Sequence, residues 1–520
     1  MSRNFSGSLT STLPDPIFVP KLKGAMLREL AVVVDCGSTN ISASAVDARG
    51  DVVAVASRPN LAHPQPGGEG WRVWDLEEIW GKACECCRKV CSEVDRKEIR
   101  AVTVCTFGAD GAPLNPDGSL AYPPICWQDT RTEGMAGDFG RYMDPLEAYL
   151  ETGYPPIRFN TLLRWIWLKE NEPEVLEGTQ WLMMPGLISF LLSGERSVDP
   201  TSAGTTMACN MARRTWSERM LRLAGLSEDF FPPWAEPGEV IGRVTRMASE
   251  ATGLPEGTPV VAAGHDTQFA AVGSGAGSEE MILSSGTWEI LMLRTERFSP
   301  SASSYEDGVL YELDARPGLW DPQLLMMGSA VLEWVRRRFY GDVGYEVMIE
   351  EAKGVGPGSD GLLLLPSFVP ETGPTRRHGT RGTVLGLSLD VHRGHFYRAA
   401  LEGLSFQLRH ALEVLATGFR AGGVRVVGGG SKNPLWNSIR ADVLGLPVST
   451  LLQEEATTLG AAIFAFLGAG VFSSVEEAGQ AMLRPGPVWE PSEGRETYEE
   501  LYRRYREVPE VLEGVYRRSL

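Results

Sequence analysis

One pattern, an apolar strand followed by a short polar turn and a second apolar strand, occurs twice in the chain and restricts its fold more than any other feature. The first copy, LAVVVDCGSTNISASAVD, begins at Leu30, and the second, EEMILSSGTWEILMLRT, begins at Glu279. Apolar runs separated by Gly, Ser, Thr and Asn are typical of strands joined by turns. A unit that recurs in each half indicates two related domains, and it would allow the two turns to present backbone N–H groups to a bound anion across a cleft.

The rest of the chain alternates between helical and strand patterns, which favours an α/β fold. A helical period runs from Asp75 to Val94, and an apolar strand begins at Ala101. The chain has 520 residues, whereas one domain usually takes roughly 100 to 200. The segment GSGAGS at 273–278 suits a hinge, because Gly and Ser bend chains. We therefore predict a poorly ordered tail over 1–27, a first domain over 28–275, a second domain over 276–490 and a charged amphipathic helical extension over 491–520.

The charge and the cysteines exclude several classes of function. A net charge of −18 argues against nucleic acid or an anionic membrane as partner, because both bind basic surfaces. No run reaches the about 18 apolar residues that a membrane span needs, and the N-terminus lacks the apolar core of a secretory signal. Eight cysteines in a long chain of this kind indicate reduced thiols. We therefore expect a cytoplasmic protein that holds any anionic ligand by local dipoles and a metal ion.

The two polar turns have the composition that phosphate binding requires. In the first, a glycine permits close backbone approach, polar side chains donate hydrogen bonds, and the strand-end carboxylate can hold Mg²⁺ through water. These residues are Asp35, Gly37, Ser38, Thr39 and Asn40. The second turn offers Gly286 and Thr287. A plain hairpin uses the same residue types, so either turn alone leaves both interpretations open.

A third glycine-rich loop follows the apolar strand VRVV. It contains Gly428, Gly429 and Asn433, and it precedes an amphipathic helix. A nucleotide can lie over such a glycine backbone, but the spacing does not match the Walker A motif. Taken alone, the loop is equally compatible with a structural turn.

Asp266 is the candidate for an acid–base group. It lies in AAGHDTQFA, directly after the apolar strand PVVAAG, and α/β proteins build sites where strands end. An ionised Asp can accept a proton from a hydroxyl group at neutral pH. Capping of the following helix is an equally good explanation from position alone.

A polyol pocket is predicted from the segments GADG and CWQDTRT. Carboxylates and a guanidinium hydrogen bond to neighbouring hydroxyls, and an indole face packs on C–H groups. The residues that we single out are Gly108, Asp110, Gly111, Trp127, Asp129 and Arg131. Some of these charged groups are equally expected in structural salt bridges.

Two other clusters are better explained by structure. Cys84, Cys87 and Cys91 share one face of the predicted helix, a spacing that favours core packing over metal binding. His392 and His395 precede a long helical period and have no matching ligand pattern, so we expect a structural role.

Taken together and in order, DCGSTN, GADG, WQDTRT, GHDTQFA, SSGTWEILM and VVGGGSKNPLWN resemble the FGGY carbohydrate kinase family of the actin-like ATPase superfamily. The resemblance covers nearly the whole chain after the tail. Within the family, AGHDTQFA, LSSGTWEILM, FNTLLRWIWLKEN, VLEWVRR, RGHFYRAALEGL and VVGGGSKNPLWN are most similar to the L-fuculokinases. WQDTRT, in contrast, follows the general family pattern.

The resemblance implies two actin-like, ribonuclease H-like domains around a central cleft, with sugar mainly on the first and ATP mainly on the second. Asp266 would then be the catalytic base, and the sugar would contact Gly108, Asp110, His265 and Thr267. The segment Asp35 to Asn40 and the pair Gly286 and Thr287 would bind phosphates and Mg²⁺. Gly428, Gly429 and Asn433 would hold the adenosine.

The reaction implied is phosphorylation of a ketose hydroxyl, O1 of L-fuculose by resemblance. L-Rhamnulose, D-xylulose and D-ribulose are the alternative substrates, and a sugar sensor without catalysis is the alternative of another class. The expected partners are a small sugar and ATP. A homodimer is the assembly that we consider.

Overall fold

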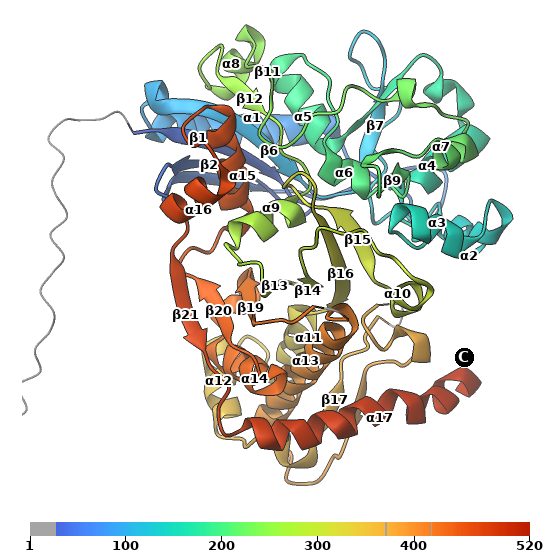
Figure 1. The fold of residues 1–520 in the computed structure, drawn as a ribbon, viewed down its shortest axis with the longest axis vertical. Helices are drawn as coiled ribbons and strands as arrows, with labels where there is room; N and C mark the ends of the chain where they lie inside the picture. The colour runs from blue at the N-terminus through green and yellow to red at the C-terminus, as the bar shows by residue number, and fades with distance from the viewer. Residues whose placement is uncertain (1–27, 370–371, 418, 520) are drawn as a thin grey trace, which may run out of the picture.

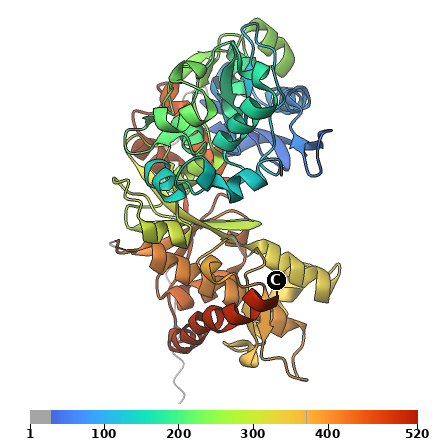
Figure 2. The ribbon, with the colours of Figure 1, turned by 90° about the vertical axis from the view of Figure 1, so that its right-hand side faces the viewer.

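The computed structural model describes residues 28–369, 372–417 and 419–519, and it shows two lobes, each built on one large sheet (Figures 1 and 2). Strands and helices alternate along the chain, so the predicted α/β class is confirmed. The predicted tail over 1–27 lies outside the described residues.

The sheet of the first lobe has six strands in the order β11-β12-β6-β1-β2-β3. Strands β12, β6 and β1 run parallel to one another, whereas β1, β2 and β3 form an antiparallel meander, of which β1 and β2 are the predicted strand–turn–strand unit. The strands are β1 (Leu30–Cys36), β2 (Asn40–Asp47), β3 (Val52–Pro59), β6 (Ile99–Thr106), β11 (Val240–Arg243) and β12 (Pro259–Val261).

The sheet of the second lobe has seven strands in the order β15-β16-β14-β13-β19-β20-β21. Strands β13, β19 and β20 are parallel, and β13 pairs with β14 in antiparallel fashion. The strands are β13 (Glu280–Ser285), β14 (Trp288–Met292), β15 (Leu310–Leu313), β16 (Trp320–Met327), β19 (Gly423–Val427), β20 (Val448–Leu451) and β21 (Pro485–Trp489).

The two sheets repeat one arrangement. In each, the first strand of the repeated sequence pattern pairs antiparallel with the next strand on one side and parallel with a later strand on the other: β1 with β2 and β6, β13 with β14 and β19. The internal repeat that the sequence indicates is therefore a structural repeat, and its two turns occupy equivalent positions in the two sheets.

Helices cover both faces of the large sheets. Those that precede the second sheet are α1 (Leu76–Glu93), α2 (Glu133–Gly137), α3 (Pro145–Thr152), α4 (Thr161–Asn171), α5 (Met184–Ser193), α6 (Pro200–Gly204), α7 (Glu218–Ala224), α8 (Arg246–Thr252) and α9 (Asp266–Gly273). Those that follow β13 are α10 (Ala302–Asp307), α11 (Ser329–Val335), α12 (Tyr345–Lys353), α13 (Arg393–Leu415), α14 (Pro434–Leu444), α15 (Ala456–Gly468), α16 (Val475–Met482) and α17 (Arg495–Ser519). Short two-stranded ladders pair β4 (His63–Pro64) with β5 (Arg72–Val73), β7 (Gly111–Leu114) with β8 (Gln180–Met183), β9 (Cys209–Asn210) with β10 (Thr215–Trp216), and β17 (Leu363–Leu365) with β18 (Thr383–Leu385).

The residues of β1 that precede Asp35 are all apolar, which suits a strand whose sheet is covered on both faces. Val32 and Val34 pack in the cluster that contains α1, and Ala31 and Val33 pack in the cluster that contains α15. Helix α15 comes from late in the chain, yet it lies beside the first sheet, as Figure 1 shows by the red helix next to the blue strands. The division in space therefore does not follow the order of the chain, and the predicted domain limits stay a prediction.

Local signals explain several helices. Asp75 caps α1, accepting a hydrogen bond of 3.0 Å from the backbone N–H of Glu78. Cys84, Cys87 and Cys91 are buried on one face of this helix, and all eight cysteines are buried free thiols. At α13, the side chains of His392 and His395 form a capping box, which confirms their structural role.

The predicted C-terminal extension contains the helix α17. One face of this helix is buried: Tyr498, Tyr502 and Tyr505 pack around Phe406 of α13. In the part of the chain that the structure describes, no helix has both the length and the apolar character to cross a membrane.

Candidate active site

The carboxyl ends of three adjacent parallel strands bring the main candidates together. Asp35 lies near the end of β1, the loop with Gly108 follows β6, and Asp266 follows β12. The backbone N–H of Thr106 donates to the carbonyl of Gly264 at 3.0 Å, which continues the pairing of β6 and β12 to this edge. Sites in α/β folds form at such an edge.

Asp266 is the first residue of α9, and its side chain does not cap that helix. The N-cap position belongs to His265, which makes no side-chain capping bond. The Oγ1 hydroxyl of Thr267 donates to Oδ1 of Asp266 at 3.2 Å. The carboxylate therefore lies in the first turn of α9, where it is hydrogen-bonded to Thr267, and not at the N-cap position.

The surroundings of Asp266 act on its charge in opposite directions. Although 31% of its side chain is exposed, burial is the largest effect and raises the pKa of Asp266; the positive charge of His265 and hydrogen bonds from Thr267 oppose it. The helix N-terminus also favours a negative charge at this position. A carboxylate held in this way can accept a proton from a bound hydroxyl group.

Asp35 lies close enough to Asp266 for the two charges to interact. Burial, followed by the negative charges of Asp266 and Glu455, raises the pKa of Asp35 to about 7. Oxygen ligands and an excess of negative charge suit Mg²⁺, which is commonly held by one or two carboxylates together with water and phosphate oxygens. Among the described residues, no three His, Cys, Asp or Glu side chains are arranged to hold a metal ion. Asp35 would therefore offer Mg²⁺ one carboxylate, and the other ligands would be water and phosphate oxygens.

His265 is held by a residue that the sequence did not single out. Its Nδ1 lies 3.1 Å from Oε2 of Glu312, on β15 of the second sheet, and its Nε2 lies 3.4 Å from Oδ1 of Asp266. Burial alone would lower the pKa of His265, but the charge and hydrogen bond of Glu312, together with Asp266, raise it to about 9. No local pattern marks Glu312, because the strand that carries it is remote in sequence from the motif that it contacts.

The two glycines of the first loop pack closely against their neighbours. A Cβ atom at Gly108 would lie 3.0 Å from the His265 ring and 3.0 Å from Thr205. At Gly111, a Cβ atom would lie 2.5 Å from the carbonyl of Leu182. Gly108 therefore lies against the His265 ring, whereas Gly111 begins β7 and packs on β8.

The charged residues predicted for the polyol pocket are buried in salt bridges. Asp110 pairs with Arg164 at 2.7 Å, and the Trp74 indole N–H donates to it at 2.6 Å. Burial raises the pKa of Asp110, and Arg164 is the main opposing effect. The partner Arg164 lies on α4, in a string that the sequence analysis used only for the resemblance.

Asp129 and Arg131 form a second buried pair, at 2.8 Å. The Arg131 guanidinium also stacks over the rings of Trp71 and Trp167, at 4.4 and 4.9 Å from the ring centroids. The side chains of both residues are at most 2% exposed. A role of this pair in direct sugar contact stays a prediction.

Both predicted phosphate turns have exposed residues, and in both a neighbouring polar side chain holds the backbone. In the first, Asn60 anchors the backbone by a side-chain bond of 2.9 Å to the carbonyl of Gly37, and Thr39 and Asn40 are exposed. In the second, the carbonyl of Gly286 accepts bonds from the N–H and Oγ of Ser329. Side-chain hydrogen bonds to backbone carbonyls therefore fix both turns in place.

The glycine-rich loop lies directly against the second turn. A Cβ atom at Gly428 would be 2.8 Å from the carbonyl of Ser285, whereas a Cβ atom at Gly429 would meet nothing within 4 Å. Asn433 caps α14 and donates to the Tyr397 hydroxyl at 3.1 Å. Gly429 therefore faces free space beside the turn, and Asn433 holds the loop in place.

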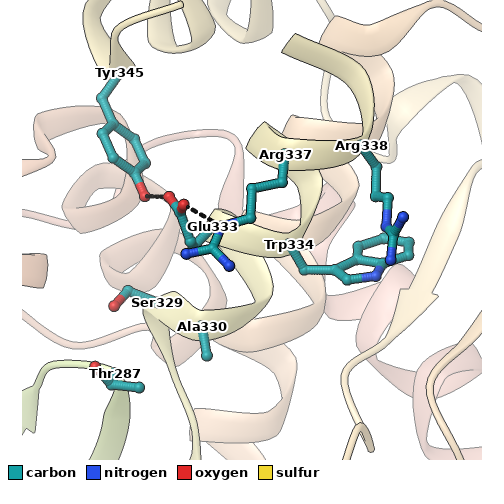
Figure 3. Close-up of a pocket in the computed structure, with 8 residues that line it drawn as sticks. All are labelled: Thr287, Ser329, Ala330, Glu333, Trp334, Arg337, Arg338 and Tyr345. Carbon is teal, nitrogen blue, oxygen red and sulfur yellow. Dashed lines mark hydrogen bonds and ion pairs between the residues drawn. The ribbon is translucent and has the colours of Figure 1, made fainter. Parts of the chain in front are cut away.

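A cavity of about 700 Å³ opens next to the second turn. Thr287 of the turn lines it, and the remaining walls come from α11 and the segment after it (Figure 3). The lining residues are Thr287, Ser329, Ala330, Glu333, Trp334, Arg337, Arg338 and Tyr345. The spacing of Ser329, Glu333 and Arg337, one helical face directly after β16, is the signal that the sequence analysis missed.

Glu333 is hydrogen-bonded to several residues in and beside this cavity. It accepts hydrogen bonds from Arg336 at 2.7 and 2.8 Å, from Arg337 at 2.7 Å and from the Tyr345 hydroxyl at 3.1 Å. These bonds lower the pKa of Glu333 to about 2. The Trp334 indole provides an aromatic wall (Figure 3), a surface on which a flat ring can pack.

Comparisons with known proteins agree with this geometry. Two family models match: "FGGY family of carbohydrate kinases, N-terminal domain" over residues 30–273, and the C-terminal domain of the same family over residues 281–469. The L-fuculokinase of Escherichia coli (strain K12) is 40% identical over 457 residues, which are 87% of this chain and 95% of the relative. The L-fuculokinase of Salmonella typhi is 38% identical over 495 residues, which are 94% of this chain and all of the relative.

The fold is shared with solved structures. The xylulose kinase from Rhodospirillum rubrum matches with a TM-score of 0.84 and 25% identity, covering 94% of this chain and 100% of that structure.

Proposed function

The chain belongs to the FGGY family of carbohydrate kinases and is an ATP-dependent sugar kinase, and from this premise we propose that it phosphorylates O1 of L-fuculose with Asp266 as the base. Identity of 40% to an L-fuculokinase over most of both chains supports the choice of sugar. The strand-end position of Asp266, beside Asp35 and His265, supports the choice of base.

ATP is proposed to lie along the second sheet and to reach the first one with its phosphates. The cavity lined by Thr287 and Trp334 accommodates the base and ribose, with Gly428 and Gly429 at its side and Asn433 supporting the loop. The turn N–H groups of Gly37–Asn40 and of Thr287 are proposed to face the phosphates. Gly286, whose own N–H donates to the carbonyl of Trp288, permits their close approach to the backbone. Asp35 would hold Mg²⁺, which when bound neutralises charge on the phosphate oxygens.

In the proposed step, the sugar oxygen attacks the γ-phosphorus, the new O–P bond forms as the bond to the ADP oxygen breaks, and the hydroxyl proton passes to Asp266. His265 and Thr267 flank the carboxylate and orient the hydroxyl group. The transition state of phosphoryl transfer is loose and rich in charge, so positioning and electrostatic stabilisation account for most of the acceleration.

The sugar is proposed to lie beside Asp266 and the His265 ring, against which Gly108 packs. Asp110, Gly111, Asp129 and Arg131 are proposed to shape this pocket from within, because their packing fixes the loops that surround it.

Replacing the base tests the mechanism. The substitution Asp266→Asn keeps the shape of the side chain but removes its ability to take a proton, so kcat should fall by about 10³-fold or more. ATP binding, measured by isothermal titration calorimetry, should be unchanged. The matched control is Asp117→Asn, in an exposed turn, which should keep full activity. Near-normal turnover by Asp266→Asn would mean that another group is the base.

A panel of ketoses tests the substrate. With L-fuculose, L-rhamnulose, D-xylulose and D-ribulose in a coupled ADP-release assay, kcat/KM should be highest for L-fuculose, by about tenfold or more over each other sugar. ³¹P NMR of the product should place the phosphate on O1. The match to a xylulose kinase structure makes D-xylulose the alternative to watch, and a higher kcat/KM for it would overturn the proposed substrate.

A cytoplasmic location and a homodimer complete the proposal. The substrate ATP and eight unpaired buried thiols support the location. Light scattering coupled to gel filtration tests the assembly, with twice the mass of one chain expected for the dimer.

A further inference from the structure

Glu312 belongs to the second sheet, but its side chain lies in the site of the first lobe. It is on the edge strand β15, opposite Asp321 of β16. The neighbouring Leu313 packs against α6 of the first lobe, where a Cβ atom at Gly204 would lie 3.4 Å from the Leu313 side chain. The Glu312 side chain is 3% exposed, so this carboxylate is enclosed where the two lobes meet.

Both oxygens of Glu312 are occupied by donors. Oε2 accepts a hydrogen bond from the Gln268 side-chain amide at 2.5 Å and lies 3.1 Å from Nδ1 of His265. Oε1 accepts a hydrogen bond from the Tyr154 hydroxyl. A buried carboxylate that only accepts hydrogen bonds is stabilised in its ionised form, and these donors together with His265 lower the pKa of Glu312 despite its burial.

The same geometry determines the state of His265. One ring nitrogen faces a carboxylate of the second lobe, and the other faces the carboxylate of Asp266 at 3.4 Å. A neutral imidazole has one N–H group and can satisfy only one of these acceptors, whereas the imidazolium ion has an N–H group for each. The two contacts therefore favour the doubly protonated ring.

The titratable groups that act on this ring are all acids. They are Glu312 on β15, Asp266 on α9 and Asp199, which precedes α6. Asp266 in turn interacts with Asp35 at the end of β1. The imidazolium is thus the positive charge that offsets a set of acids converging on the proposed base.

We propose that Glu312 is a positioning residue that acts through His265: it holds the ring doubly protonated against Asp266, so that the base stays ionised and directed at the sugar hydroxyl. This inference rests on the proposed role of Asp266. It deepens that role by assigning a carboxylate of the other lobe to the control of the base.

The decisive variant is Glu312→Gln, which keeps the size of the side chain and an oxygen that accepts from Nδ1, but removes the charge. Neutral His265 should then predominate above neutral pH, and Asp266 should lose its counter-charge. We expect kcat to fall roughly 10- to 100-fold at neutral pH, with the KM for ATP unchanged. In the pH profile of kcat/KM, the alkaline limb should move to lower pH by about one unit or more, because His265 loses its proton at lower pH. The acid limb should not rise, because His265 is still protonated there and the negative charge of Glu312, which raises the pKa of Asp266, is gone.

A control separates this effect from damage to the fold. Tyr154→Phe removes a hydrogen bond to Glu312 but leaves its charge in place, so both limbs should stay where they are. A merely structural role of Glu312 would lower the rate at every pH in both variants without moving either limb, and that result would overturn the proposal.

A direct readout uses neither sugar nor ATP. With ¹³C-labelled histidine, the NMR signal of His265, assigned by its loss in His265→Gln, should titrate near pH 9 in the wild type and about one unit or more lower in Glu312→Gln. An unchanged titration would overturn the proposal. If Glu312→Gln does not fold, His265→Gln serves instead: its acid limb should rise and its alkaline limb should disappear, and a profile that keeps both limbs contradicts the proposal.

The experiments distinguish an error in the proposed base, Asp266, from an error in the proposed coupling of Glu312 to His265. An active Asp266→Asn enzyme with a shifted His265 titration in Glu312→Gln would reject the base and keep the Glu312–His265 coupling. An inactive Asp266→Asn enzyme with an unshifted titration would reject only the inference drawn here for Glu312.

Discussion

Asp35 shows how a binding residue can weaken the unliganded protein. Its carboxylate is surrounded by protein and faces two other acids, so its pKa rises to about 7 from an ordinary value of 3.8. A raised pKa means that the folded state binds this proton more tightly than the unfolded state does. The associated stability is fully present below about pH 3.8 and is lost as the pH rises through about 7.

The substitution Asp35→Asn should therefore stabilise the unliganded protein at alkaline pH. At pH 8 the variant no longer carries the unfavourable charge, and its Tm should exceed that of the wild type by roughly 2 °C or more. At pH 5 the difference in Tm should shrink, because Asp35 is then largely protonated in the folded wild-type protein. Differential scanning calorimetry at the two pH values measures this.

The same variant should lose the response to MgATP. Added MgATP should raise the Tm of the wild type but leave that of Asp35→Asn nearly unchanged, because the proposed metal ligand is missing. A variant that is less stable than the wild type at both pH values would contradict the charge argument.

At the level of single residues, the sequence predicts positions better than partners. Asp35 and Asp266 follow apolar strands, and this placement alone locates them at the edge where the sheet ends. Asp110 follows a strand in the same way, but its charge is matched by Arg164 inside the protein. Glu312 is the reverse case, because its partner His265 lies at the start of α9 in the other lobe. Pairing across long stretches of chain leaves no local pattern.

Helices α9 and α15 cross with their backbones in close contact. A Cβ atom at Gly460 would lie 1.9 Å from the carbonyl of Phe269, and one at Gly273 would lie 1.9 Å from the carbonyl of Ala456. The small residues of α15 permit this close packing. The sequence did not predict that α9, whose first residue is Asp266, is the partner.

The substitution Gly460→Ala should therefore push the two helices apart. Because the obstacle is backbone, we expect a destabilisation of about 1–3 kcal/mol, seen as a lower Tm, together with a reduced kcat as α9 carries Asp266 away from its place. The control is Gly81→Ala in α1, where a Cβ atom meets nothing within 4 Å; it should stabilise the protein by about 0.5–1 kcal/mol. Equal behaviour of the two variants would show that the crossing tolerates a wider spacing.

At the scale of the whole molecule, the repeated strand–turn–strand pattern predicted the architecture. Equivalent turns in two sheets follow from it directly, and both sheets have the expected pairing. The repeat does not predict that α15, from the second half of the chain, packs on the first sheet. Its apolar, small-residue sequence suits any well-packed interior, so the choice of sheet depends on the tertiary fold.

The position of α15 has a consequence for synthesis. Ribosomes add about 5–20 residues per second, and the strand residues Ala31 and Val33 emerge long before the helix, Ala456–Gly468, that covers them. One apolar face of the first sheet therefore remains uncovered for most of translation, a state that favours aggregation or capture by chaperones. A ribosome that stalls before Ala456 leaves a nascent chain whose first half is already made but cannot close its own core.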